Sequence, residues 1–320
     1  MNIVLLERNS VGQDVDVSCF DELGEVTAYG NTTTEEEVRQ RIQDAEIVIA
    51  NKAPLTRRAL EEAKNLKMIG ILATGYDICD TAYCKERGIP VCNAVNYSTA
   101  MVAQHTITLA LCLTQRIVHY DQYVKSGAYS AQNSFSNFDV PFHELDGKTW
   151  GIVGMGNIGR RVSNIAEALG CRVVYHSLTG REKQVPYMQV DKETLLRESD
   201  VISLHCPLSP LSRDFMDAEA FQRMKPSAVL VNVARGPVVN QQALYHALVN
   251  GEIAGAAVDV LEKEPLPQDD PLLAIQDSGR LIITPHLAWA SVEARQRCVR
   301  EVYLDIAAFL HGELRNAVNL

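Results

Sequence analysis

The sequence predicts an α/β protein with two domains, each built on a doubly wound parallel sheet. Short apolar runs of strand length alternate with amphipathic runs of helical length along almost the whole chain. A glycine-rich turn stands between one such strand and the helix that follows it. The length of 320 residues, 47% of them hydrophobic, supplies enough apolar surface for two buried cores.

The first third of the chain alternates strands and helices. Thr34 and Glu37 have the spacing of a capping box and predict that a helix begins at this point. The expected strands are Ile3–Leu6, Glu46–Ala50, Met68–Leu72 and Pro90–Cys92, and the expected helices include Thr34–Ala45 and Thr56–Ala63.

A single long helix is expected from Thr99 to Lys125, with a stop at Gly127. The segment Gly127–Gly147 has no periodicity, which predicts a loop that leads into the second α/β domain. One stripe of the helix carries residues that are four apart, namely Met101, His105, Leu109, Leu113 and Ile117.

The second domain opens at Thr149 with an apolar strand, and the last helix of the chain is expected at about Ser291–Leu310. The helix after the glycine-rich turn is expected at Asn157–Leu169. The further strands are expected at Arg172–Tyr175, Val201–His205, Val229–Val233, Ala256–Val260 and Leu281–Ile283.

The composition argues against several classes of protein. A net charge of −10 disfavours nucleic acid as a partner, because an acidic surface repels phosphate backbones. The eight cysteines have neither metal-site spacing nor the density of a disulfide scaffold, which favours thiols in a reducing cytoplasm. The N-terminus lacks the features of a signal peptide, and no apolar run has the length of a membrane span. We therefore expect a cytoplasmic protein with no metal, nucleic-acid or membrane partner.

The glycine-rich turn Gly154-Met155-Gly156-Asn157-Ile158-Gly159 matches the G-x-G-x-x-G pattern of dinucleotide-binding sites. Its first glycine allows a tight turn, its second lets a pyrophosphate approach the backbone, and its third lets the helix pack on the strand. The N-terminus of that helix favours the negative charge of the phosphates. Because a strand precedes the turn and a helix and a strand follow it, a Rossmann-like domain is favoured over a simple glycine turn.

The sequence leaves the choice between NAD and NADP open. An acidic residue that binds the ribose 2′-hydroxyl of NAD is expected about 20 residues after the turn. The strand ends instead at Ser177, which is followed by Thr179 and Arg181. A hydroxyl and a nearby arginine would accept a 2′-phosphate; alternatively, Arg181 lies on a solvated loop.

Charged residues follow three later strands, at the sheet edge where doubly wound folds bind ligands. Arg235 ends an apolar strand, and its guanidinium needs an anionic ligand or, alternatively, an internal ion pair. Asp259 and Glu264 follow the next strand, and His286 follows the last. A histidine whose protonated form is favoured by a carboxylate suits proton transfer to a ketone that accepts a hydride.

Together these motifs resemble those of the D-isomer-specific 2-hydroxyacid dehydrogenase family over essentially the whole chain. The likeness is greatest to its glycerate dehydrogenase, or hydroxypyruvate reductase, branch. It rests on the runs Ala73–Tyr76, Phe138–Pro141, Glu144–Thr149 and His286–Ala290.

The resemblance implies reversible reduction of a small 2-keto acid, hydroxypyruvate or glyoxylate first, by NAD(P)H. Arg235 would hold the substrate carboxylate, His286 would be the acid/base, and Glu264 would orient and charge it. The backbone amides of Thr74 and Gly75 would bind the same carboxylate. Further contacts to the cofactor would come from Cys206, Pro207, Ser212, Val233, Ala234, Ala288 and Asp259, the last near the nicotinamide.

The resemblance also implies how the chain is organised. A flavodoxin-like substrate domain would comprise residues 1–99 and 287–320, so that the C-terminal helix completes it. A dinucleotide-binding Rossmann domain would comprise residues 100–286. A homodimer would form largely through this second domain.

A few positions depart from the family pattern or have no assigned role. Gln104 and Asn240 stand where the family carries acidic residues. Asn51-Lys52 follows a strand of the first domain and would read the far end of the substrate or, as we favour, carry a solvated lysine. We interpret His105 and His205 as packing residues.

Other functions stay open beside this one. D-lactate-type and phosphoglycerate-type dehydrogenases are alternatives, the latter less favoured because no added regulatory domain precedes the end at Leu320. A rival of another class is a dimeric protein that senses the nucleotide without catalysis. The trio of Arg235, Glu264 and His286 argues against a sensor, which needs no such combination.

Overall fold

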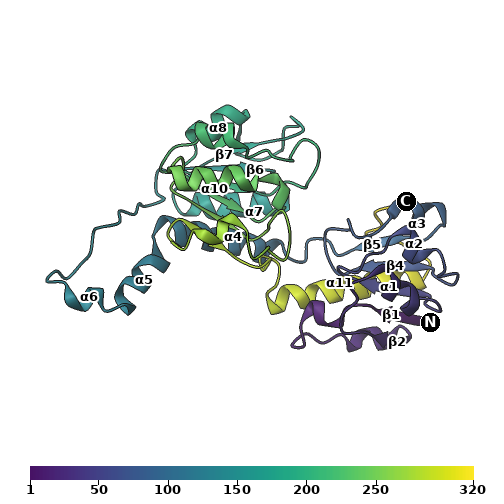
Figure 1. Cartoon of the computed structure of the whole chain (residues 1–320). Helices are drawn as coiled ribbons and strands as arrows, with labels where there is room; N and C mark the ends of the chain where they lie inside the picture. Colours follow the sequence, from purple (N-terminus) through teal and green to yellow (C-terminus); the bar gives the residue numbers. More distant parts are fainter. The chain divides into compact units, whose positions relative to one another are not determined.

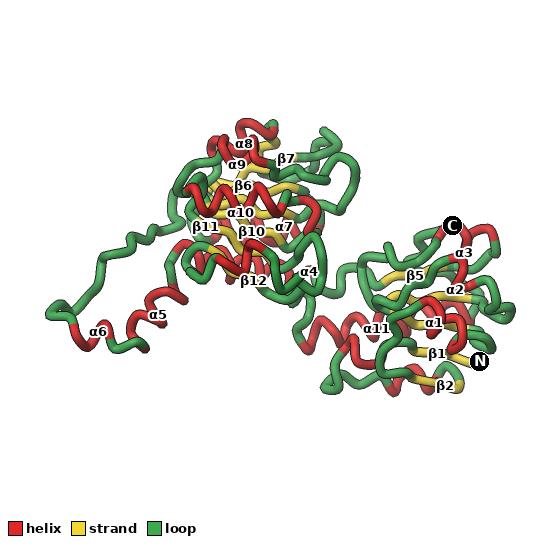
Figure 2. Tube along the Cα trace, viewed as in Figure 1, coloured by secondary structure: helices red, strands yellow, loops and turns green.

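All strands pair in parallel and form two separate sheets, drawn as yellow tubes in Figure 2. The computed structural model describes residues 1–320, which divide into two compact units. Unit 1 comprises residues 1–98 and 289–320, and unit 2 comprises residues 99–288. The predicted α/β class with two parallel-sheet domains is confirmed.

Unit 1 has five strands in the order β2-β1-β3-β4-β5, which is the flavodoxin-like order. The C-terminal helix α11 packs on this sheet. Its Val302 and Ile306 lie next to the position that a Cβ on Gly70 of β4 would take. The elements are β1 (Asn2–Leu5), β2 (Glu25–Ala28), α1 (Glu35–Arg41), β3 (Ile47–Ala50), α2 (Arg57–Leu60), β4 (Met68–Ile71), α3 (Thr81–Glu86), β5 (Val91–Asn93) and α11 (Val292–Leu310).

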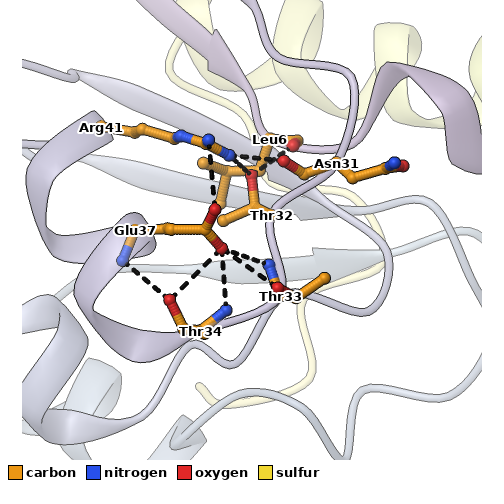
Figure 3. Close-up of polar contacts among 7 residues, drawn as sticks. All are labelled: Leu6, Asn31, Thr32, Thr33, Thr34, Glu37 and Arg41. Carbon is orange, nitrogen blue, oxygen red and sulfur yellow. Dashed lines mark hydrogen bonds and ion pairs between the residues drawn. The ribbon is translucent and has the colours of Figure 1, made fainter.

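The capping box predicted for the first helix is present at the start of α1 (Figure 3). The hydroxyl of Thr34 accepts a hydrogen bond from the amide of Glu37, and the Glu37 carboxylate accepts from the amides of Thr33 and Thr34. Beside it, the hydroxyl of Thr32 donates to the carbonyl of Leu6 at the end of β1. These contacts anchor the start of the helix next to the sheet.

Unit 2 has seven strands in the order β12-β11-β10-β9-β6-β7-β8. Six of them, from β8 to β11, repeat the order of a Rossmann fold, whose ligand crevice lies where the strand order reverses, here between β6 and β9. The elements are α4 (Thr99–Thr114), α5 (Ile117–Lys125), α6 (Ala128–Ala131), β6 (Thr149–Val153), α7 (Asn157–Ala168), β7 (Arg172–His176), β8 (Met188–Gln189), α8 (Lys192–Glu198), β9 (Val201–Leu204), α9 (Ala218–Arg223), β10 (Val229–Asn232), α10 (Gln241–Asn250), β11 (Gly255–Val258) and β12 (Leu281–Ile283).

Helices cover both faces of the sheet of unit 2, as its strand sequences require. Alternate strand residues point to opposite faces, so Leu230 of β10 packs with α8, α9 and α10, while its neighbour Val231 packs with α4 and α7. Strands buried on both sides explain the continuous apolar runs in the sequence.

The prediction of one long helix from Thr99 to Lys125 is wrong. The chain breaks between α4 and α5 because Arg116 adopts a left-handed conformation with φ of 55°. The guanidinium of Arg116 also donates to the carbonyl of Gly279, a contact from a distant part of unit 2. The apolar stripe runs on across the break, so the periodicity alone does not show it.

The predicted loop after this helix contains the short helix α6 and forms an arm together with α5. We define the arm as residues 117–143; Figure 1 shows α5 and α6 extending away from the sheet layers of unit 2. Neither helix of the arm has a buried residue. Hydrogen bonds of Tyr120 to Val140 and of Tyr129 to Phe135 hold the arm in shape.

Candidate functional site

Five of the predicted site residues lie at one edge of the sheet of unit 2. Gly154, Ser177, Cys206, Arg235 and His286 each follow the carboxyl end of a strand within a few residues. Because all the strands are parallel, these ends meet at the same edge. The sheet thereby gathers side chains that are far apart in the sequence.

The glycine-rich turn has the shape that a pyrophosphate requires. Gly154 has φ of +96°, a conformation that favours glycine. A Cβ on Gly159 would lie 2.3 Å from the carbonyl oxygen of Gly154, so this glycine is needed for the helix to approach the strand. A Cβ on Gly156 would instead point into open space, with no atom within 4 Å. No side chain caps the N-terminus of α7, so its amides suit the phosphates of a dinucleotide.

The segment after β7 forms a tight turn at the place expected for the ribose. The amide of Gly180 donates to the carbonyl of Ser177 at 2.9 Å, and Gly180 has φ of +70°. Thr179 and Arg181 are exposed, and the guanidinium of Arg181 has no hydrogen bond or ion pair. These residues therefore fit a 2′-hydroxyl and also a 2′-phosphate.

The loop after β9 is closed by its own side chains. The hydroxyl of Ser212 donates to the carbonyl of Pro207 at 2.7 Å and accepts from the amide of Ser209 at 2.7 Å. Ser212 is fully buried, so its hydroxyl shapes the loop. Burial raises the pKa of the Cys206 thiol to about 11, which keeps this residue neutral and unreactive.

Arg235 stands directly after β10 on a turn built by Asn232. The side chain of Asn232 accepts from the amide of Ala234 at 3.0 Å and donates to the carbonyl of Arg235 at 3.1 Å. The guanidinium of Arg235 donates only to the carbonyl of Ala234 and forms no ion pair. Val233 and Ala234 complete the turn as partly and fully buried apolar residues. The positive charge of Arg235 is thus left for an anionic ligand, and the internal ion pair considered above is absent.

Glu264 and His286 form the expected pair. Nδ1 of His286 lies 2.8 Å from Oε2 of Glu264, and both side chains are about one-third exposed. Because a carboxylate only accepts hydrogen bonds, Nδ1 carries a proton in this contact. The other ring nitrogen, Nε2, is the one from which His286 can exchange a proton with a ligand.

Gly236 brings the turn of Arg235 against the loop of Glu264. A Cβ on Gly236 would lie 1.9 Å from the carbonyl oxygen of Leu261, so the two backbones touch. The amide of Leu261 in turn donates to Oε1 of Glu264 at 3.0 Å. A continuous series of contacts therefore links the Arg235 turn to the histidine, and the three predicted catalytic residues lie in one region of unit 2.

Asp259 is buried and shapes the turn that carries His286. Its Oδ1 accepts from the hydroxyl of Thr284 at 2.5 Å and from the amide of Leu287 at 2.7 Å, and its Oδ2 accepts from the amide of Ala288 at 2.8 Å. Burial acts to raise the pKa of the Asp259 carboxyl, but hydrogen bonds, with that from His105 the largest, outweigh it and hold the pKa below its usual value. The group is therefore a carboxylate at neutral pH.

Thr74 and Gly75 lie in unit 1, in the loop after β4, and offer two backbone donors. Neither amide has a hydrogen-bond acceptor within the chain. The loop is fixed from behind, because the side chain of Asn93 donates to the carbonyl of Thr74 at 2.6 Å and the Thr74 hydroxyl donates to Ala94. The two amides are thus free to donate to a ligand that accepts hydrogen bonds, such as a carboxylate.

Sequence reasoning missed three residues of the site region. Asn232 is fully buried, and an amide inside the apolar run of β10 was the signal that could have identified it. Thr284 had no distinguishing signal. The interpretation of His105 as a packing residue is incomplete, because Nε2 of His105 lies 3.2 Å from the Thr284 hydroxyl. For His205 burial lowers the pKa to about 3, so this histidine is neutral and fits a role in packing.

The other unusual positions have structural partners. Asn240 caps α10, accepting from the amide of Ala243 at 3.0 Å, and Gln104 is exposed on α4. The carboxylate of Glu7 accepts from the amides of Asn51, Lys52 and Ala53, each at 2.8 Å. The side chain of Lys52 is exposed, which agrees with the solvated interpretation.

Comparison with known proteins places these features in a family. The family described as "D-isomer specific 2-hydroxyacid dehydrogenase, NAD binding domain" matches residues 107–288. A hydroxypyruvate reductase of Blautia hydrogenotrophica is 38% identical over all of both chains. A glycerate dehydrogenase of Methylorubrum extorquens is 39% identical over 99% of this chain and 98% of its own.

A solved structure extends the likeness to three dimensions. The D-lactate dehydrogenase of Aquifex aeolicus, complexed with NAD and lactic acid, is 29% identical, with a TM-score of 0.82 over 98% of this chain and 96% of its own. The parallel sheets, the glycine turn and the relatives that match the whole chain all point to the same family. The chain belongs to the D-isomer-specific 2-hydroxyacid dehydrogenase family, whose members are NAD(P)-dependent oxidoreductases.

Proposed function

We propose that this protein reduces hydroxypyruvate or glyoxylate to the corresponding 2-hydroxy acid, D-glycerate in the first case, using NADH or NADPH. The relatives that carry the names hydroxypyruvate reductase and glycerate dehydrogenase support this substrate class, because they match nearly the whole chain. The observation that carries the proposal is the His286–Glu264 pair beside an arginine with no ion pair, at the edge that also bears the glycine turn.

In the proposed reaction, each of the three residues has a separate task. When bound, the nicotinamide supplies the hydride that adds to the carbonyl carbon of the keto acid. Nε2 of His286 gives its proton to the carbonyl oxygen, where negative charge develops. The Glu264 carboxylate accepts from Nδ1–H, which fixes the orientation of the ring and leaves Nε2 to exchange the proton. Oxidation of the hydroxy acid runs the same steps backwards, with His286 as the base.

Arg235 binds and orients the substrate. Its guanidinium can hold a carboxylate through two parallel hydrogen bonds, which sets the position of the adjacent carbonyl group. Fixing the reacting groups in this way lowers the entropic part of the barrier. The free amides of Thr74 and Gly75 are further donors of the type that a carboxylate accepts.

Oxidation of NADH and NADPH in the presence of hydroxypyruvate, glyoxylate, pyruvate and a phosphorylated 2-keto acid tests the proposal. We expect turnover with hydroxypyruvate or glyoxylate, and its loss by at least 1,000-fold in His286→Ala with cofactor affinity kept. His311→Ala, at an exposed histidine after α11, is the matched control and should keep full turnover. Absence of turnover with every keto acid would favour a nucleotide sensor, and a clear preference for pyruvate or the phosphorylated acid would contradict the assigned substrate.

We further propose that two copies form a homodimer through the arm of unit 2. The arm exposes large apolar side chains, among them Phe135 at 87% and Phe138 at 79% exposure. Clusters of exposed apolar side chains are typical of protein interfaces, because such side chains stabilise a structure only when a partner covers them. The other exposed members are Ile117, Val124, Tyr129 and Phe142.

Light scattering after size exclusion tests the dimer. The wild type should have twice the 35.4 kDa mass of the chain, and the double variant Phe135→Ser/Phe138→Ser should have the mass of one chain. Val249→Ser, which removes an apolar side chain of 52% exposure from α10, is the control and should stay a dimer. A monomeric wild type, or a dimeric double variant, would refute the role of the arm.

We propose the cytoplasm as the location of the protein. All eight cysteines are free thiols, and six of them are buried, as is usual in a reducing compartment. None of the helices is both long enough and apolar enough to span a bilayer. Fractionation of the native host, with detection of the untagged protein, tests this location; recovery with the secreted or envelope fractions would contradict it.

A further inference from the structure

His105 has a position that packing alone does not explain. It lies on α4, the helix that contacts β10, β11 and β12, and its side chain is 14% exposed. Its Nε2 lies 3.2 Å from Oγ1 of Thr284 and 3.5 Å from Oδ1 of Asp259. Both partners belong to the group of residues that shapes the turn of His286.

The direction of these hydrogen bonds follows from counting protons. Thr284 has one hydroxyl proton, and the 2.5 Å contact directs it to the Asp259 carboxylate, which has none to offer. The oxygen of Thr284 must therefore accept in its contact with His105. Nε2 of His105 consequently carries a proton, whether the ring is neutral or charged, and shares it between Oγ1 of Thr284 at 3.2 Å and Oδ1 of Asp259 at 3.5 Å. His105 thus supports the Asp259 carboxylate both directly and through the Thr284 hydroxyl.

Asp259 in turn holds the backbone on which His286 depends. His286 has φ of 56°, a left-handed conformation that is unfavourable for any residue with a Cβ. The turn is kept by the amides of Leu287 and Ala288, which donate to the Asp259 carboxylate, and by the His286 amide, which donates to the carbonyl of Asp259. The orientation of the imidazole therefore depends on a carboxylate that stays in one place.

We propose that His105 is a positioning residue for His286. It supplies a fixed N–H donor from the sheet-bound helix α4, locks the rotamer of the Thr284 hydroxyl, and so holds the Asp259 carboxylate under the turn of the acid/base histidine. The inference rests on the proposed function of His286. It assigns a kinetic role to a side chain that contacts neither the glycine turn nor the Glu264–His286 pair.

Four variants test this role. His105→Leu removes the donor and His105→Gln keeps an N–H at similar reach, while Thr284→Val removes the hydroxyl and preserves the shape of the side chain. In hydroxypyruvate reduction we expect kcat to fall at least fivefold in His105→Leu and in Thr284→Val, with KM for the keto acid within twofold of the wild type. His105→Gln should recover most of the loss. The kcat of the double variant His105→Leu/Thr284→Val should lie within twofold of that of the less active single variant, because both side chains act on the same Asp259 carboxylate.

A control and a second readout separate positioning from general stability. Gln104→Leu changes the neighbouring exposed position of α4 and should leave kcat unchanged. Hydrogen exchange of the Leu287 and Ala288 amides, which needs no substrate, should become at least threefold faster in His105→Leu and Thr284→Val. A kcat of Thr284→Val within twofold of the wild type, a multiplicative loss in the double variant, or no recovery in His105→Gln would each overturn the proposal.

The exchange measurement also keeps this inference distinct from the function on which it rests. If the wild type turns over no keto acid while the two amides exchange faster in the variants, the assigned reaction fails and the support of the turn by His105 stands. If the wild type is active and neither exchange nor kcat responds to the variants, the positioning role fails and the reaction stands.

Discussion

Replacing Asp305 with asparagine isolates the free-energy cost of a buried carboxyl in unit 1. Asp305 lies on α11 and is 1% exposed. Its Oδ1 accepts from the Asn316 side chain at 2.9 Å and lies 3.5 Å from Nη1 of Arg315, while its Oδ2 has no hydrogen-bond partner. Burial raises the pKa of Asp305 to about 7, because the pull of Arg315 in the opposite direction is too weak to compensate.

The sign of the pH dependence follows from proton binding. Between the ordinary pKa of an aspartate and pH 7, the folded state keeps a proton that the unfolded state has released, so stability falls as the pH rises through this window. A shift of about three units corresponds to at most about 4 kcal/mol. Asparagine has the hydrogen-bonding groups of the protonated acid but does not titrate. Asp305→Asn should therefore have a higher free energy of unfolding than the wild type at pH 8. At pH 5 this difference between the two proteins should be smaller by about 3 kcal/mol.

Urea unfolding followed by circular dichroism at pH 5 and pH 8 measures this difference. Hydrogen exchange of peptides from α11 would locate the change in unit 1. Asp44→Asn, at an exposed aspartate of the same unit, serves as the control and should show no pH-dependent gap. The reasoning fails if the difference between wild type and Asp305→Asn is the same at both pH values.

The remaining predictions concern the site of unit 2. Glu264→Gln removes the carboxylate that accepts from Nδ1 of His286, so kcat for keto-acid reduction should fall at least tenfold with cofactor affinity kept; an unchanged kcat would exclude this role. Gly156→Ala should weaken binding of NADH and NADPH at least tenfold with an unchanged Tm, whereas Gly159→Ala should lower the Tm because its Cβ meets a backbone oxygen. Calorimetry measures the Tm and titration measures cofactor binding. Equal effects of the two variants would contradict the geometry. Arg181→Ala should raise KM for NADPH at least tenfold while leaving KM for NADH within twofold, since a hydrogen bond to a charged group contributes about 1.5–3 kcal/mol; parallel changes for both cofactors would show that Arg181 is merely solvated.

Features that depend on a few neighbouring residues were predictable from the sequence. The capping box at Thr34 and the turn from Gly154 to Gly159 need only their own spacing and local backbone geometry, and both are present as expected. The buried strands were also predictable, because strands covered on both faces are apolar throughout. The strands β2 and β8 escaped prediction, since each is short, lies at a sheet edge and is largely exposed.

What the sequence by itself determined is the class of fold, the glycine turn and the residue types at the ends of the strands. Only the tertiary structure decided how those residues act, because their partners are distant in the chain. Glu264 contacts His286, which is 22 positions away in the sequence, and His105 contacts Thr284, which is 179 positions away. Neither contact produces a periodic pattern in the sequence. Arg116, at the break between α4 and α5, likewise donates to the carbonyl of Gly279, far along the chain. A parallel sheet brings such residues to one edge, and hydrogen bonds within that edge select which of them stay free for a ligand, as Arg235 does, and which, as Asp259 does, hold the others in place.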